Sequence, residues 1–191
     1  MSSREKWNDR YRSVNAAFPE AAGVLLAYQH LLPVSAKALD LACGRAGNAF
    51  LLASNGLDTT AWDISDEVIK QVQTLANREG LTILTETRDI SERPPTPDSF
   101  DVIVVSRFLD RKLIPALKQA IRTGGLIYYQ TFIKDKSGSV GPDNPDYLLE
   151  QNELLRFFQD WIVRAYHEEG SIGNIEVGLR NQAALVAQKP A

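Results

Sequence analysis

The fold is decided by the stretch Leu39-Asp40-Leu41-Ala42-Cys43-Gly44-Arg45-Ala46-Gly47-Asn48. It reads as an apolar strand that ends in an acid, then a tight turn of small residues, then the start of a helix. Small residues let a ligand approach the backbone, and the free N–H groups at a helix N-terminus attract an anionic group. Asp40 is placed to accept a hydrogen bond from a ligand ammonium group, directly or through water. The stretch therefore predicts a ligand-binding turn, the alternative being a plain connection between a strand and a helix.

The backbone of this turn needs special geometry, which glycine adopts most easily. Alanine stands at positions 42 and 46 and fits the turn only if φ stays negative there. We therefore expect Gly44 and Gly47 to take the demanding conformations. Cys43 has no histidine near it in the sequence, so we interpret it as a small buried packing residue rather than as a nucleophile.

Outside this turn, the chain alternates between short apolar runs and segments of helical periodicity, which predicts an α/β fold. Strands are predicted at residues 38–41, 59–63, 81–84, 100–105, 126–132, 161–167 and 182–187. Helices are predicted at residues 48–55, 66–79, 113–122 and 153–158, the second capped by Ser65 and the third ended by Gly124-Gly125. Parallel strands joined by helices place a ligand crevice at the carboxyl ends of the strands.

Composition and charge argue against several classes of protein. A length of 191 residues suits one α/β domain, so residues 1–191 are predicted to form a single domain. The net charge of −3 gives no basic footprint for a nucleic-acid partner. No run approaches the roughly 18 apolar residues of a membrane helix, and no apolar signal region follows the N-terminus, so no membrane partner is expected. The single cysteine fits a reducing compartment, and we expect a cytoplasmic protein.

The run from Leu39 to Asn48 resembles motif I of the class I S-adenosylmethionine-dependent methyltransferases. In that motif, an acid-x-Gly-x-Gly-x-Gly loop holds the methionine part of the cofactor, and alanines 42 and 46 depart from it. The opening Trp7-Asn8-Asp9-Arg10-Tyr11 resembles the tellurite-resistance and thiopurine S-methyltransferase branch, in which a helix before the sheet covers the cofactor. The resemblance extends from Trp7 to the last strand.

The resemblance implies a Rossmann-like, mostly parallel seven-stranded sheet with helices on both faces and a C-terminal antiparallel strand. Residues 1–33 would then form an N-terminal helical lid segment, and residues 36–191 the sheet core. Cofactor contacts are implied at eleven positions: Asp40, Ala42, Cys43, Gly44, Gly47, Asn48, Asp63, Ile64, Asp89, Ile90 and Ser106.

Two acids among these positions, and the isoleucine that follows each of them, have stated roles. An acid about 20 residues beyond the glycine turn can hold both ribose hydroxyls of an adenosine, and Asp63 stands there, with Ile64 placed against the adenine. The alternative is that Asp63 only caps the next helix. Asp89 would meet the adenine amino group, with Ile90 as an apolar wall, unless Asp89 is an ordinary loop residue.

Substrate contacts are expected from several parts of the chain. Ser106 and Arg107 follow a predicted strand at the place of the family's motif IV, so we take them as candidates for positioning the substrate. Trp7, Tyr11 and Arg12 precede the sheet, and Trp7 and Tyr11 would share one helix face, unless they only pack the helix onto the sheet. Tyr147 would cap the substrate mouth from a proline-rich loop, unless that loop is a simple turn. No residue is assigned as catalytic.

The implied chemistry is methyl transfer to a small soft nucleophile, a thiol or a metalloid oxyanion such as tellurite. We find no convincing general base, so proximity and orientation would carry the reaction. Two alternatives remain: a nicotinamide-dependent oxidoreductase, and a non-catalytic S-adenosylmethionine-binding protein. His30 and His167 stand far apart and no cysteine cluster exists, so no metal site is predicted. A monomer or a homodimer is expected.

Overall fold

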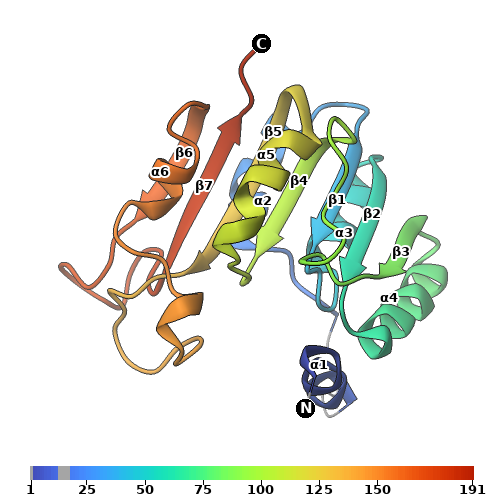
Figure 1. The fold of residues 1–191 in the computed structure, drawn as a ribbon, viewed down its shortest axis with the longest axis horizontal. Helices are drawn as coiled ribbons and strands as arrows, with labels where there is room; N and C mark the ends of the chain where they lie inside the picture. The colour runs from blue at the N-terminus through green and yellow to red at the C-terminus, as the bar shows by residue number, and fades with distance from the viewer. Residues whose placement is uncertain (1, 13–17) are drawn as a thin grey trace.

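The structure is a computed structural model that describes residues 2–12 and 18–191, and its centre is one seven-stranded sheet (Figure 1). The strand order is β3-β2-β1-β4-β5-β7-β6. The first five strands pair in parallel, whereas β7 runs antiparallel to both β5 and β6. The strands are β1 (Lys37–Leu41), β2 (Asp58–Asp63), β3 (Ile83–Thr87), β4 (Phe100–Ser106), β5 (Ile121–Phe132), β6 (Ile162–Glu168) and β7 (Gln182–Gln188). The predicted mostly parallel sheet with a C-terminal antiparallel strand is confirmed.

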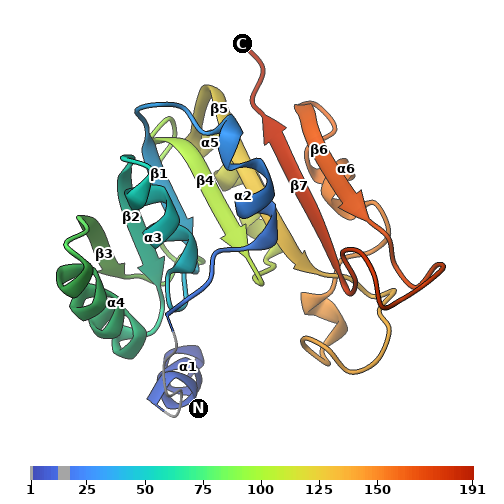
Figure 2. The same ribbon diagram turned by 180° about the vertical axis from the view of Figure 1, so that it is seen from behind.

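Helices cover both faces of this sheet, as predicted. Figures 1 and 2 show α5 and α6 on one face and α2, α3 and α4 on the other, while α1 stands beyond the carboxyl ends of β1 and β2. The helices are α1 (Ser3–Arg12), α2 (Gly23–Tyr28), α3 (Gly47–Ser54), α4 (Asp66–Glu79), α5 (Ile114–Ala120) and α6 (Glu153–Phe157). Single 3-10 turns are η1 (Gln29–Leu31), η2 (Arg111–Leu113) and η3 (Pro145–Tyr147). Within the described residues, no helix has the length and apolar character needed to cross a bilayer.

Strand β4 shows why the sheet is sandwiched between two helical layers. Ile103 and Val105 join the apolar cluster under α5, whereas Val102 and Val104 join the cluster under α2. All four side chains are fully buried. A continuous β-branched run is typical of a strand covered on both faces, and this strand therefore forms the centre of the core.

The helix α4 begins and ends where the sequence predicts. The Ser65 hydroxyl accepts a hydrogen bond from the Val68 amide at 3.2 Å and so caps the first turn. Gly80 ends the helix in the left-handed conformation, with φ of 66°, which glycine adopts without steric cost.

Several predicted boundaries differ from the structure, most clearly at the junction of α5 and β5. The helix α5 ends at Ala120 rather than at residue 122, and β5 begins at Ile121 rather than at residue 126. Ile121 pairs with Phe100 of β4 and is fully buried, so burial of a β-branched side chain in the sheet outweighs extension of the helix. Gly124-Gly125 therefore lies inside β5. The strand β3 also lies later than predicted, over Ile83–Thr87 instead of residues 81–84.

The connection between β3 and β4 is a loop stabilised by one arginine. The Arg88 guanidinium lies 3.9 Å from the centroid of the Trp62 ring, a distance suited to a cation–π interaction. The same guanidinium donates hydrogen bonds to the main-chain oxygens of Arg93 and Pro94. The arginine side chain thus covers the Trp62 ring and fixes the proline-rich loop.

Candidate functional site

The turn after β1 has a left-handed backbone at three positions. Gly44 has φ of 52°, as expected, but Ala42 and Ala46 also have positive φ, of 54° and 62°. The prediction that φ stays negative at the two alanines is wrong. A left-handed alanine costs about 1–2 kcal/mol, so contacts elsewhere must impose this conformation on the turn.

Gly47 is required for another reason than the one predicted. It is the first residue of α3 and its φ is not positive. A Cβ atom at Gly47 would overlap the main-chain oxygen of Glu20 and the amide nitrogen of Ala21. Gly47 therefore permits the segment before α2 to pass directly over the start of α3.

The neighbouring strand β2 provides the contacts that hold the turn. The Cys43 amide donates to the Trp62 oxygen at 2.8 Å, and the Gly44 amide donates to Asp63 Oδ2 at 2.9 Å. The other carboxylate oxygen, Asp63 Oδ1, accepts from the Ser65 amide at 2.9 Å. These bonds tie the end of β2 to the turn after β1 and to the start of α4.

Asp63 contacts both the turn after β1 and the start of α4. The Ser65 amide, at the start of α4, donates to one oxygen of the Asp63 carboxylate, and the Gly44 amide, in the turn after β1, donates to the other. Burial raises the pKa of the Asp63 carboxyl, and the backbone N–H groups act in the opposite direction. A carboxylate has about four acceptor sites, so two N–H bonds leave capacity for ribose hydroxyls.

Asp40, Asn48 and Ser106 are brought together at the ends of β1 and β4. The Asn48 side-chain amide donates to Asp40 Oδ1 and to Ser106 Oγ, both at 3.0 Å. Asp40 Oδ2 accepts from the Ala49 amide at 3.1 Å. Three residues predicted at the cofactor site therefore form one hydrogen-bonded group.

The direct form of the Asp40 prediction does not fit the structure. The Asp40 side chain is completely buried, so a ligand ammonium group cannot reach it without rearrangement. Burial raises the Asp40 pKa to about 7, against the opposing effect of the Asn48 and Ala49 hydrogen bonds. Contact through a neighbouring group, Asn48 above all, is what this arrangement allows.

Asp89 and Ile90 lie beside Asp63 because their strands are neighbours. The Arg88 amide donates to the Asp63 main-chain oxygen at 2.7 Å. Asp89 is half-buried and accepts from the Ser91 amide at 3.0 Å, whereas Ile90 is buried in the core. Ile64 is half-buried next to Asp63. Cys43 is buried as predicted, and burial raises the pKa of its thiol well above the usual value.

Arg107 has a strained backbone directly after β4. Its φ is 53°, and its amide donates to the Gln130 main-chain oxygen at 2.8 Å. Left-handed residues other than glycine cluster at functional sites. The Arg107 side chain is exposed, next to the half-buried Ser106.

The helix α1 lies over the glycine turn, and its predicted shared face is confirmed. The rings of Trp7 and Tyr11 stack with centroids 5.9 Å apart. The Tyr11 hydroxyl would lie 2.8 Å from a Cβ atom at Gly44, which shows how closely it covers the turn. Burial and the nearby Asp63 raise the pKa of this phenol. Arg12, in contrast, is exposed and pairs with Asp9 at 2.8 Å.

A single asparagine docks α1 onto the start of α4. Asn8 Oδ1 accepts from the Ser65 hydroxyl at 2.6 Å, and Asn8 Nδ2 donates to Asp66 Oδ1 at 2.8 Å. Of the predicted lid segment, residues 1–33, Met1 and residues 13–17 lie outside the described residues.

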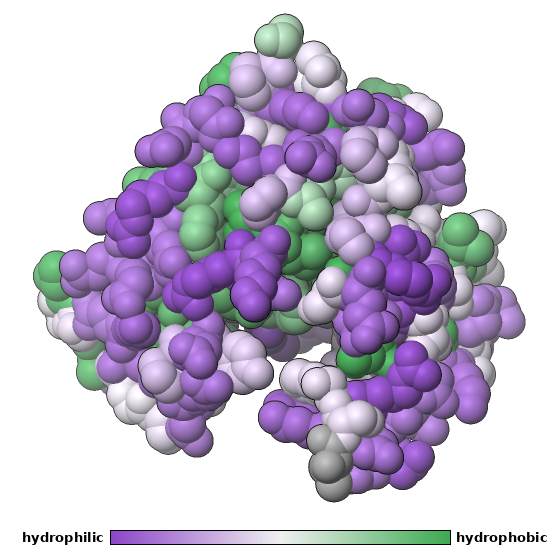
Figure 3. All heavy atoms as spheres, in the orientation of Figure 1, coloured by the Kyte–Doolittle hydropathy of each residue, from purple (hydrophilic) through white to green (hydrophobic). Residues whose placement is uncertain are grey.

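Tyr147 is the last residue of η3, and its side chain is half-exposed. Arg111 holds this segment, since its guanidinium forms two bonds of 2.8 and 2.9 Å to the Glu153 carboxylate. It also donates to the main-chain oxygens of Asp146 and Leu148. Figure 3 shows the surface hollowed between α1 and the segment after β5, beneath the ends of β1 and β4.

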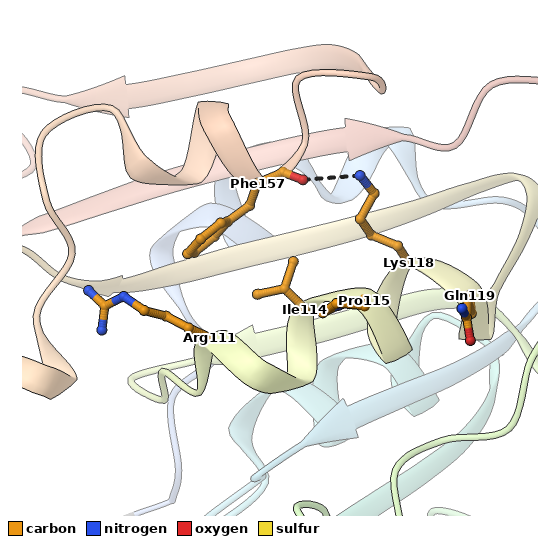
Figure 4. Close-up of a pocket in the computed structure, with 6 residues that line it drawn as sticks. All are labelled: Arg111, Ile114, Pro115, Lys118, Gln119 and Phe157. Carbon is orange, nitrogen blue, oxygen red and sulfur yellow. Dashed lines mark hydrogen bonds between the residues drawn. The ribbon is translucent and has the colours of Figure 1, made fainter.

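A second hollow of about 460 Å³ lies between α5 and α6 (Figure 4). It is lined mainly by apolar groups, including Ile114 and Phe157. Both cationic side chains that line it already have partners. Arg111 pairs with Glu153, and Lys118 contacts the Phe157 main-chain oxygen and Asp160. None of the predicted site residues lines it. Among the described residues, no group of three or more His, Cys, Asp or Glu side chains could hold a metal ion.

Sequence reasoning missed two residues of the strand-end site. Asn8 stands within the quoted opening of the chain but was given no role, and Gln130 was noted only as part of a strand. The signal for Gln130 was present, because a polar side chain within an apolar strand needs a buried partner.

The strand order, the glycine turn after β1 and the buried acid at the end of β2 together define the fold of the class I S-adenosylmethionine-dependent methyltransferases. The small residues of the turn, and the acceptor capacity that remains on the Asp63 carboxylate, are suited to this cofactor. The chain belongs to the tellurite resistance protein TehB family, whose model matches residues 5–181. This membership argues against the nicotinamide-dependent oxidoreductase.

Individual relatives agree with this assignment. The crystal structure of TehB from Haemophilus influenzae is 25% identical, with a TM-score of 0.69 over 97% of this chain and 66% of that one. Hemagglutinin 1 of Eikenella corrodens is 28% identical over 69% of this chain and 46% of its own length. The uncharacterized methyltransferase YbaJ of Bacillus subtilis is 36% identical over 45% of this chain and 35% of its own. The matches thus span less than half the length of either curated relative.

Proposed function

We propose that this methyltransferase transfers the methyl group to a small soft nucleophile, a thiol or a metalloid oxyanion such as tellurite. The observation that supports this proposal is that the two buried carboxylates at the strand ends, those of Asp40 and Asp63, already accept hydrogen bonds. Asp40 accepts from Asn48 and Ala49, and Asp63 accepts from Gly44 and Ser65. Neither is placed as a free general base, and a soft nucleophile needs none.

The residues of the site then act by binding and orientation. When bound, S-adenosylmethionine supplies an electrophilic methyl group on a sulfonium. In this proposal, Asp63 binds the ribose hydroxyls, the methionine part lies against the small residues of the glycine turn, and Asp89 meets the adenine. Such orientation can lower a barrier by roughly 7–11 kcal/mol in favourable cases.

The acceptor would enter on the side of β4. Arg107 is an exposed cation there, next to Ser106, and a cation attracts an oxyanion or a thiolate. Trp7, Tyr11 and Arg12 of α1 would form one wall of the mouth, and Tyr147 the opposite wall.

The proposal extends to the organisation of the protein. We propose that residues 1–191 act as one domain, with the segment 1–33 as the lid, and that the working unit is a monomer or a homodimer. Cys43, as the single cysteine of the chain, supports a reducing compartment such as the cytoplasm.

The test measures formation of S-adenosylhomocysteine from S-adenosylmethionine with tellurite, selenite, 2-mercaptoethanol, a primary amine and a phenol as acceptors. We expect turnover with a soft acceptor and none with the amine or phenol. Arg107→Ala should lower kcat/KM for tellurite about tenfold, while Arg78→Ala, an exposed arginine at the end of α4, should leave it unchanged. Binding of S-adenosylhomocysteine without transfer to any acceptor would contradict the proposal and favour the non-catalytic alternative.

A further inference from the structure

Gln130 is a buried polar residue at the carboxyl end of β5. It is 9% exposed and lies opposite Ser106 of β4 in the register of the sheet. Its other neighbour in the sheet is Ala184 of β7. Ser106 and Ala184 both have short side chains, so the amide side chain of Gln130 has room to reach other elements.

The Gln130 side chain caps a helix that has no local cap. Gln130 Oε1 accepts from the Val24 amide at 2.7 Å, across 106 residues of sequence. Val24 belongs to the first turn of α2, which receives no side-chain cap from Ala22. Gln130 Nε2 donates to Gln182 Oε1 at 2.7 Å. Since a main-chain amide can only donate, the bond to Val24 fixes which end of the Gln130 amide faces α2.

The segment 19–24, which we call the strap, ends at Val24 and is also held by contacts that precede Val24. The Ala22 amide donates to Asn48 Oδ1 at 2.8 Å, and the absence of a side chain at Gly47 lets Glu20 pass directly over it. Asn48 follows β1 and Gln130 ends β5, and β4 lies between these strands. The strap therefore passes the end of β4, where Ser106 and Arg107 are found.

The main chain of Gln130 has a second function. Its carbonyl oxygen accepts the Arg107 amide at 2.8 Å, the contact that accompanies the left-handed backbone of Arg107. One residue thus contacts the strap through its side chain and the tip of β4 through its main chain.

We propose that Gln130 is a positioning residue for the methyl acceptor. Its contacts fix the position of the strap relative to Arg107. The strap and Arg107 form two walls of the crevice on the side where the acceptor would bind. The inference rests on the proposed function, because it assigns the β4 side of the crevice to the acceptor. The inference adds to the proposed function that binding of the acceptor depends on Gln130, which the acceptor does not touch.

The experiment compares Gln130→Leu, Gln130→Glu and a control, Gln188→Leu, in the full chain. Gln188 also uses its side chain for hydrogen bonds, accepting from Arg164 and donating to the Gly124 oxygen, but at the opposite end of β7. Three quantities are measured: the Kd of S-adenosylhomocysteine by calorimetry, and kcat and KM with tellurite or 2-mercaptoethanol as acceptor.

Gln130→Leu removes the acceptor for the Val24 amide, so we expect the acceptor KM to rise about tenfold. The Kd of S-adenosylhomocysteine should stay within twofold and kcat within threefold. Gln130→Glu keeps an oxygen for Val24, and the Gln182 amide can turn to donate to it, so the acceptor KM should return to within threefold of the wild-type value. Gln188→Leu should leave all three quantities unchanged.

An unchanged acceptor KM in Gln130→Leu would overturn the inference. So would a rise in KM matched by an equal rise in the Kd of S-adenosylhomocysteine, since a purely structural role would weaken both. A wild-type chain that transfers no methyl group would instead refute the proposed function, and the role of Gln130 would fall with it.

Discussion

The main-chain oxygen of Glu20 occupies the space that a side chain on Gly47 would need. This contact joins two parts of the chain that are remote in sequence, the segment before α2 and the first turn of α3. Since protein interiors are close-packed and tolerate added atoms poorly, the pair gives a sharp test of whether the strap rests on the glycine turn.

Gly47→Ala should destabilise the protein by about 1–3 kcal/mol, the usual cost of forcing a methyl group into a filled space. Gly23→Ala is the matched control, because Gly23 is also the first residue of a helix and a Cβ atom there meets only an ordinary contact with Gln130. The control should be neutral or slightly stabilising. Urea unfolding of both variants checks this, and a Gly47→Ala protein as stable as the wild type would show that the contact is absent.

Asp63→Ala should raise the Kd of S-adenosylhomocysteine at least tenfold, or about 1.4 kcal/mol. The substitution removes the ribose acceptor and the anchor of the Gly44 amide together. Asp58→Ala removes an exposed acid from the other end of the same strand and should leave the Kd unchanged. Titration calorimetry measures both, and equal affinity in the two variants would refute the ribose assignment.

The left-handed alanines can be tested by a pair of Ala→Gly substitutions. Ala46 and Ala49 are both completely buried, but Ala46 has φ of 62° whereas Ala49 lies within α3. Each variant loses one methyl group and loosens the unfolded chain, but only Ala46→Gly relieves backbone strain. Ala49→Gly should therefore be the more destabilising by about 1–2 kcal/mol. Equal losses in thermal unfolding would mean that the turn is not strained at Ala46.

The pKa of Asp40 predicts a pH dependence of stability. Burial raises it from 3.8 to about 7, so between these values the folded state holds a proton that the unfolded state has lost. The free energy of unfolding contributed by this group therefore falls as pH rises from about 4 to 7, by at most about 1.4 kcal/mol per pH unit. Asp40→Asn removes this contribution.

The measurement is the difference in unfolding free energy between wild type and Asp40→Asn at several pH values. This difference cancels the groups that titrate alike in both proteins. As pH rises from 4 to 7, the unfolding free energy of the wild type should fall relative to that of Asp40→Asn. Above pH 7, the difference between the two proteins should become constant. A difference that is flat over this range would show that Asp40 ionises normally in the folded state.

Much of the sheet follows from local sequence. The run 39–48 and the β-branched run of β4 predict their strands, and Ser65 and Gly80 predict the bounds of α4. These features depend on residues a few positions apart, where hydrophobic periodicity and capping preferences act directly. The bounds of α5 and β5 do not follow, because Ile121 is drawn into the sheet by its partner Phe100.

The sequence predicts residues for the site, but it does not predict the contacts between them. Asn48 of α3 joins Asp40 of β1 to Ser106 of β4, and Asp63 of β2 accepts from the turn after β1, so these contacts join different elements. The left-handed alanines were missed because the bonds from Cys43 to Trp62 and from Gly44 to Asp63 are tertiary. No local rule connects residues as distant as Gln130 and Val24, so only the folded structure shows the strap.

The hydrogen bonds between the glycine turn and β2 have a consequence for the rate of ligand association. The Cys43 and Gly44 amides are held by hydrogen bonds to the neighbouring strand, so contacts within the protein already order the turn. Preorganisation of this kind saves conformational entropy that would otherwise weaken affinity. The slow step of ligand entry is then expected at α1, whose Tyr11 covers the turn, and the rate of association should follow how readily that helix swings aside.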